Sequence, residues 1–307
     1  HLGRANGMVQ FGLAASEILA PALAGVLILT VQLEGVILID FTTFLFAIAS
    51  LVLVRFPKSQ SAHTDKAETT LKQEFSLGWK FIVARKGLFG LLVFFAVVNF
   101  LWGMVGALIV PMILGFTTSD KLGAIISIAG VGMLVGSLIM SIWGGPQRRI
   151  NGVLNFEFMS GICFLLMGLQ PSFWLIAMGA FGAHMTIAIV YGSNQAIWQN
   201  KVAPVVQGRV FAAQQMIARA ASPLAYLLAG PLADDLFEPL LATNGFLSEN
   251  AGKIIGTGPG RGIGLLFILM GMIKMAVTVV CHAHPRIRLV EDELPDALDE
   301  ISNTPHL

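Results

Sequence analysis

Charged side chains inside long apolar stretches are the residues of this sequence with the most evident chemistry. Glu17, Arg219 and Lys274 each lie near the middle of such a stretch. Charge inside a membrane is costly, so each of these residues is a functional hypothesis. In a low-dielectric surrounding, Glu17 can bind and release a proton near neutral pH, or it can form a structural salt bridge with Arg219 or Lys274. The sequence leaves both roles open.

Three more ionisable residues, His184, Asp40 and Glu157, lie within apolar stretches. Arg219 keeps its charge at physiological pH, so it serves either as the partner of a carboxylate or as a binder of anionic substrate. His184 is either a hydrogen-bonded packing residue or a proton relay, and a metal site is not expected because no His or carboxylate follows at i+3 or i+4. Asp40 and Glu157 lie nearer the ends of their stretches, where they can reach lipid headgroups or cap a neighbouring helix.

Uncharged polar and small residues add two further expectations. A cavity for a large amphipathic ligand is predicted from residues that share a polar or aromatic side chain in an apolar context: Gln10, Asn99, Trp102, Asn194, Gln195 and Gln215. Close helix packing is predicted from small residues at helical spacing: Gly123, Ala129, Gly132 and Gly136.

The composition decides the class of protein that must hold these residues. Of the 307 residues, 55% are apolar and 12% are charged, and the net charge is +1. A soluble domain carries roughly 25% charged residues, so a water-covered globular protein is excluded, as are a disordered chain and a nucleic-acid binder. Two cysteines cannot form a disulfide framework or a four-ligand zinc site, and we expect no cofactor. The sequence predicts an all-α polytopic membrane protein.

Eight stretches are long and apolar enough to cross a bilayer, which needs roughly 20 residues per helix. They run near 8–30, 35–54, 88–114, 122–143, 153–169, 173–198, 210–233 and 262–282. None alternates with period two, so the spans are predicted to be helices. Between them, residues 55–70 read as a cytoplasmic linker, and Leu71 to Ile82 as an amphipathic helix at the membrane surface. Residues 284–307 read as an acidic, solvated cytoplasmic tail.

The basic residues orient these spans. With the start of the chain in the cytoplasm, fourteen of the 19 Lys and Arg residues fall on the cytoplasmic side and three on the outside. This asymmetry follows the positive-inside rule and places both ends of the chain in the cytoplasm.

An internal repeat relates the first and seventh spans. Shifting the chain by 205 residues aligns Gly3-Arg4, Gln10 and Gly25 with Gly208-Arg209, Gln215 and Gly230. Parallel six-helix repeats are typical of one large transporter architecture. In that architecture the first span here is the fifth of twelve, so we expect four further helices, about 120 residues, upstream.

Several segments resemble the major facilitator superfamily, and within it the drug, macrolide and siderophore exporters of bacterial inner membranes. GRANGMVQFGLAASEILAPALAGVLI resembles the fifth helix of these exporters, LKQEFSLGWKFIVARKGLFGLL the entry into the seventh, and QGRVFAAQQMIARAASPLAYLLAGPLADDLFEPLL the eleventh. The resemblance covers the whole chain as helices 5–12 of 12. It implies that residues 1–54 end the first six-helix half, 55–87 connect the halves, and 88–283 form the second half.

The resemblance extends to two structural motifs. Pro21 and Gly25 lie in an APALAG stretch similar to the glycine-proline element of the fifth helix, although Ala20 stands where a glycine usually precedes the proline. Arg148 and Arg149 resemble the arginines of a conserved cytoplasmic loop, whose aspartate is absent here. Proton-driven export is implied by this likeness.

The function predicted from the sequence is secondary active efflux of hydrophobic or amphipathic small molecules by alternating access, coupled to protons. A lipid or lysolipid flippase of the same fold and a truncated, non-transporting membrane subunit remain alternatives. A membrane enzyme is not expected, because no catalytic His-Asp or Ser-His-Asp cluster is evident. The expected partners are a small-molecule substrate, protons and membrane lipid, and the expected state is a monomer in the inner membrane.

Overall fold

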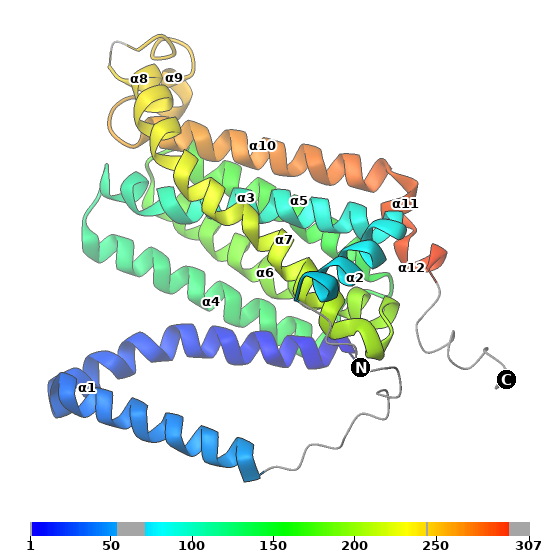
Figure 1. The fold of residues 1–307 in the computed structure, drawn as a ribbon. Coiled ribbons are helices and arrows are strands. Elements are labelled where there is room, and N and C mark those ends of the chain that lie inside the picture. Colours follow the sequence, from blue (N-terminus) through cyan, green and yellow to red (C-terminus); the bar gives the residue numbers. More distant parts are fainter. Residues whose placement is uncertain (1, 54–70, 244, 295–307) are drawn as a thin grey trace, which may run out of the picture.

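A computed structural model describes residues 2–53, 71–243 and 245–294 of the chain (Figure 1). Within these ranges, the side chains of residues 17–26, 28–29, 51–53 and 71–72 are outside the description. The helices are α1 (Leu2–Leu53), α2 (Leu71–Ala84), α3 (Lys86–Leu114), α4 (Ser119–Trp143), α5 (Arg149–Leu169), α6 (Phe173–Lys201), α7 (Pro204–Pro231), the π-helix η1 (Leu232–Phe237), α8 (Glu238–Leu241), α9 (Gly252–Ile255), α10 (Arg261–Ala283), α11 (Pro285–Arg288) and α12 (Val290–Glu293). The described residues contain no strand, which confirms the predicted all-α class.

Seven helical segments among the described residues are long and apolar enough to cross a membrane. Six of them contain the helices α3, α4, α5, α6, α7 and α10, and each matches one predicted span. The seventh is Thr30–Ser50, in the second part of α1. The predicted spans 8–30 and 35–54 thus both lie in α1, where only Gln32 departs from helical geometry, with φ 59° and ψ 178°.

The break at Gln32 divides α1 into two arms that meet at a sharp bend and then diverge (Figure 1). The first arm lies along α4 and also contacts α6. Gly7 makes this approach close, because a Cβ added there would lie 2.7 Å from the backbone N of Ser141. In the second arm, none of the most apolar window of Thr30–Ser50 is buried.

The remaining long helices form one bundle in which neighbours in space are not always neighbours in sequence. Helix α5 packs against α6 and α10, α4 packs against α6, and α3 packs against α7. The predicted small-residue contact is confirmed for Gly132 and Gly136 of α4, where an added Cβ would overlap the carbonyl oxygens of Phe181 and Met185. It is wrong for Gly123, which has no atom within 4 Å of the Cβ position.

Short helices cover the two ends of the bundle (Figure 1). Helices α8 and α9 gather at one end, whereas α2, α11 and α12 lie at the other, near the start of α1. Helix α2 confirms the helix predicted for this segment, and its Glu74 forms an ion pair of 2.6 Å with Arg209 of α7. The predicted linker 55–70 lies outside the described residues.

In the segment predicted to be a solvated tail, most side chains of residues 284–293 are exposed, but two apolar ones, Ile287 and Val290, are buried. Helices α11 and α12 fold onto the bundle, where Val290 is fully buried and packs beside Gly87. Lys201 Nζ donates hydrogen bonds to the carbonyl oxygens of Glu291, at 2.6 Å, and of Leu294. Buried apolar contacts and these hydrogen bonds hold the segment despite its acidic composition. Residues 295–307 lie outside the described part of the chain.

Candidate functional site

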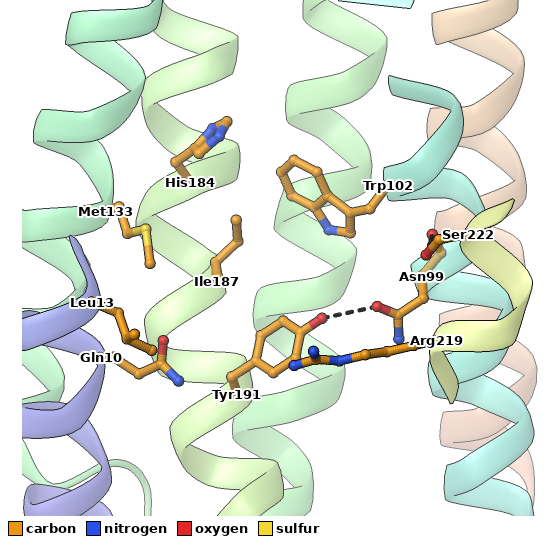
Figure 2. A pocket seen from close by; sticks show the side chains of 10 residues that line it. All are labelled: Gln10, Leu13, Asn99, Trp102, Met133, His184, Ile187, Tyr191, Arg219 and Ser222. Atoms are coloured by element: carbon orange, nitrogen blue, oxygen red, sulfur yellow. Dashed lines mark hydrogen bonds between the residues drawn. The ribbon is translucent and has the colours of Figure 1, made fainter. Parts of the chain in front are cut away.

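A cavity of about 530 Å³ opens at mid-length of the bundle, between α1, α3, α4, α6 and α7 (Figure 2). It is lined by Gln10, Leu13, Asn99, Trp102, Met133, His184, Ile187, Tyr191, Arg219 and Ser222. The size lies within the range usual for small-molecule sites. Five of the residues predicted from the sequence as site or cavity candidates therefore meet around one space: Gln10, Asn99, Trp102, His184 and Arg219.

One wall of the cavity is a hydrogen-bonded polar patch. Tyr191 Oη donates to Asn99 Oδ1 at 3.1 Å, and Asn99 Nδ2 donates to the carbonyl oxygen of Phe95 at 2.7 Å. Ser222 Oγ of α7 donates to the carbonyl oxygen of Asn99 at 3.4 Å. These bonds fix the orientation of the polar groups before any ligand arrives, which lowers the entropic cost of binding.

Arg219 is the cationic group of this cavity. Its side chain is exposed and extends from α7 towards the ring of Tyr191 (Figure 2). Among the described residues, no carboxylate forms an ion pair with it. The predicted candidate Gln215 lies one turn before Arg219 and lines a narrow extension of about 30 Å³, together with Asn194, Gln195 and Gln214.

An apolar pocket of about 550 Å³ continues the cavity between α3, α4 and α6. Trp102, Met133 and His184 line both spaces, and the other residues of the pocket include Val105, Ile109, Ile125 and Met167. His184 Nδ1 lies 2.9 Å from the carbonyl oxygen of Ala180, so this nitrogen carries the proton. The His184 ring stands edge-on to Trp102, with 5.4 Å between the ring centres.

A buried ion pair lies next to Trp102, one of the residues that line the cavity. Lys274 Nζ of α10 lies 2.7 Å from Glu157 Oε2 of α5, and their side chains are 0% and 3% exposed. Lys274 Nζ also donates to Ser160 Oγ at 2.7 Å. The same ammonium lies 5.0 Å from the ring centre of Trp102 and 4.5 Å from that of Phe164. Lys274 thus lies within the cation–π range of Trp102, which lines the cavity.

This arrangement differs from two expectations. Glu157 is buried beside Lys274 and does not cap a neighbouring helix, and Lys274 is not among the described residues that line the cavity. Tyr191 and Ser222 were missed, because a tyrosine or serine in an apolar helix gives no signal that separates a cavity residue from a packed one. The sequence contains a weak indication of the pairing of Lys274 with Glu157. Glu157 is the single acidic residue of α5, and Lys274 is the single lysine of α10.

Of the residues in the predicted structural motifs, Arg148 and Arg149 make polar contacts at the end of the bundle, whereas Gly230 has open space beside it. Arg149 Nη1 donates to the carbonyl oxygen of Ala196 at 3.2 Å, and Arg148 forms an exposed ion pair of 3.4 Å with Asp292. Both arginines therefore hold the α4–α5 connection and α12 to the end of the bundle. Gly230 lies near the end of α7 with open space at its Cβ position.

Three predicted residues belong to the first arm of α1. Glu17, Pro21 and Gly25 lie within the helix, but the side chains of this stretch are outside the described part of the structure. Glu17 follows the cavity residue Gln10 by seven residues, about two helical turns. Its role as proton carrier or salt-bridge partner therefore stays a prediction.

Comparisons with known proteins agree with this architecture. The sequence profile of the Major Facilitator Superfamily matches residues 1–226. The chain is 24% identical over 296 residues to macrolide efflux protein A of Streptococcus pyogenes, covering 94% of this chain and 66% of that protein. It is 27% identical to macrolide efflux protein A of Enterococcus faecalis, covering 73% of this chain and 70% of the relative.

A second group of relatives matches a shorter part. The multidrug efflux pump Tap of Mycobacterium tuberculosis is 27% identical over 241 residues, covering 76% of this chain and 56% of that protein. The chain thus spans between about half and about 70% of the length of these relatives. No solved structure is significantly similar to it. The matching profile covers most of the chain, so the chain belongs to the major facilitator superfamily, a family of membrane transporters.

Proposed function

We propose that this chain forms part of a drug efflux transporter that exports amphipathic small molecules through the cavity between α1, α3, α4, α6 and α7. The observation that carries the proposal is the cavity itself, where a fixed polar patch adjoins an apolar pocket at mid-length of the bundle. Transporters of this kind bind substrate near the midplane of the membrane. The efflux proteins among its relatives support the same function.

The two arms of α1 are proposed to be the last two helices of a first six-helix half, and α3 to α10 to contain the second half. Helix α1 supplies Gln10 and Leu13 to one side of the cavity, and α3, α6 and α7 supply the other. A cavity shared between two halves is what alternating access by rocking requires. In this proposal, both ends of the chain face the cytoplasm of a bacterial cell and the protein acts as a monomer.

Protons are proposed to drive the export, with Glu17 as the carrier. A carboxyl group close to the substrate site can exchange its proton for substrate if both are bound in alternation. Arg219, Gln10, Asn99, Gln215 and His184 are assigned to substrate contact, because they line the cavity or its narrow extension. Lys274 is assigned to the support of Trp102.

The test is transport of labelled chloramphenicol, an uncharged amphipathic drug, into inside-out vesicles that contain the complete protein, with and without an imposed pH gradient. Glu17→Gln is expected to abolish gradient-driven uptake and to leave chloramphenicol binding intact. The matched control is Glu249→Gln, which removes an exposed carboxylate at the far end of the bundle and should leave uptake unchanged. Full coupling in Glu17→Gln would refute the carrier assignment, and a wild-type protein without uptake under any gradient would refute export of this substrate.

A further inference from the structure

The charge balance of the cavity points to the class of its ligand. Arg219 is the residue with a permanent charge among those described as lining the cavity, its narrow extension and the apolar pocket. No Asp or Glu is among these lining residues. The described part of the cavity therefore has a positive potential, which low-dielectric walls strengthen.

Lys274, a second cation near the middle of a candidate span, is compensated within the protein. Lys274 is fully buried, lies 2.7 Å from Glu157 and donates a hydrogen bond to Ser160. Its charge is thus compensated within the protein. Arg219 is exposed to the cavity instead, and no described carboxylate is within ion-pair distance. A guanidinium presents five N–H donors and no acceptor, so an anionic group is its natural counterpart.

The surroundings of Arg219 define the rest of the ligand. Gln10, Tyr191 and Asn99 place further polar groups around the same part of the cavity (Figure 2). Beyond Trp102 and His184, the apolar pocket of about 550 Å³ has room for a ring system or a short acyl chain. An occupant that satisfies both regions has one anionic end and one bulky apolar end.

We infer that the cavity takes amphipathic organic anions, with a carboxylate or sulfonate against Arg219 and the apolar body in the pocket between α3, α4 and α6. The inference rests on the proposed transport function, because it names the ligand class of the same cavity. It also separates this site from one that selects cationic drugs, for which Arg219 would be repulsive.

Three dansyl probes test this inference, because they share one fluorophore and differ in charge: dansylglycine is anionic, dansylamide neutral and dansylcadaverine cationic. Their fluorescence is titrated with the complete protein in nanodiscs of zwitterionic lipid, and empty nanodiscs give the background. Dansylglycine is expected to bind about tenfold or more tightly than dansylcadaverine, since hydrogen bonds to charged groups are worth about 1.5–3 kcal/mol. In Arg219→Gln this preference should be lost, and in Arg219→Lys most of it should remain.

The matched control is Arg288→Gln, which removes an exposed cation at the α2–α12 end and should keep the preference. Equal binding of the charged probes, no binding of either, or a preference that survives in Arg219→Gln would overturn the inference. A preference that appears only in Glu17→Gln would also overturn it, because Glu17 would then neutralise Arg219. Loss of dansylglycine binding when phosphatidylglycerol is added would assign Arg219 to a lipid headgroup instead.

These outcomes are independent of the transport assay. Chloramphenicol uptake without an anion preference would leave the efflux function standing and remove the ligand class. An Arg219-dependent anion preference without uptake would do the reverse, and the cavity would then be an anion site in a protein that does not export this substrate.

Discussion

The buried pair of Lys274 and Glu157 gives the sharpest prediction about stability. Lys274→Met keeps most of the side-chain volume and the apolar contact with Trp102 and Phe164, but it leaves the carboxylate of Glu157 buried without its ammonium. Removing one partner of a buried ion pair costs about 3–5 kcal/mol. Both side chains are at most 3% exposed, so solvent screening does not reduce this figure.

The assay is thermal unfolding of the purified protein in detergent. The readout is the fraction of protein that stays monodisperse in gel filtration after heating. For a loss of about 3–5 kcal/mol we expect Tm to fall by roughly 6 °C or more. The double variant Glu157→Met with Lys274→Met should recover most of this loss, because an apolar pair of similar volume has no uncompensated charge. Glu74→Gln, which removes the partner of Arg209 in a partly exposed ion pair, is the matched control and should cost at most about 1 kcal/mol.

Two results would refute this reasoning. If Lys274→Met has the Tm of the wild type, the ammonium is not what compensates Glu157. If the double variant is as unstable as the single one, the loss comes from packing around Trp102 and Phe164 and not from the unpaired charge.

Three further predictions follow from contacts elsewhere in the fold. Gly136→Ala should lower Tm markedly, because the added Cβ would overlap the carbonyl oxygen of Met185. Gly123→Ala should leave Tm unchanged or raise it, because the space at this Cβ position is open. Equal effects of the two substitutions on Tm would contradict the contact between α4 and α6. Burial raises the pKa of the Glu291 carboxyl, and this effect outweighs the hydrogen bond from the Ile150 N–H, which lowers the pKa. The folded state therefore holds the carboxyl proton of Glu291 more tightly than the unfolded chain does. Stability should therefore decline as pH rises from about 4.5, the ordinary value, through the raised pKa, and Glu291→Gln should flatten this part of the Tm–pH curve. Tyr191→Phe should cost about 0.5–1.5 kcal/mol through the lost hydrogen bond to Asn99, and a Tm equal to that of the wild type would show that the bond adds nothing to stability.

The long helices could be predicted from the sequence because each apolar run alone determines a membrane span. The ends of α3, α4, α5 and α10 fall within a few residues of the predicted spans for this reason. The single residue that breaks α1 could not be predicted, because a turn around Gln32 and a loop of several residues have similar polarity. Helices α11 and α12 were missed because four residues are too few to show a helical period.

The candidate site was only half visible in the sequence. Gln10, Asn99, His184 and Arg219 stand out as polar residues in apolar runs, so their meeting around one cavity was a reasonable expectation. The pairing of Lys274 with Glu157 depends on α10 packing against α5, which are far apart in the chain. No local pattern encodes that contact, and for the same reason the approach of Lys274 to Trp102 was not foreseen.

The charge on α10 also bears on how the chain is assembled during synthesis. A lysine at the centre of a membrane helix raises the insertion free energy by about 2.5–3.5 kcal/mol when it faces lipid alone. Helix α5 leaves the ribosome well before α10, so its Glu157 enters the membrane before its partner exists. Release of α10 from the insertion machinery is therefore favoured once α5 is close enough to receive Lys274. A nascent chain that stops before α10 keeps the carboxylate of Glu157 in the bundle without its ammonium partner.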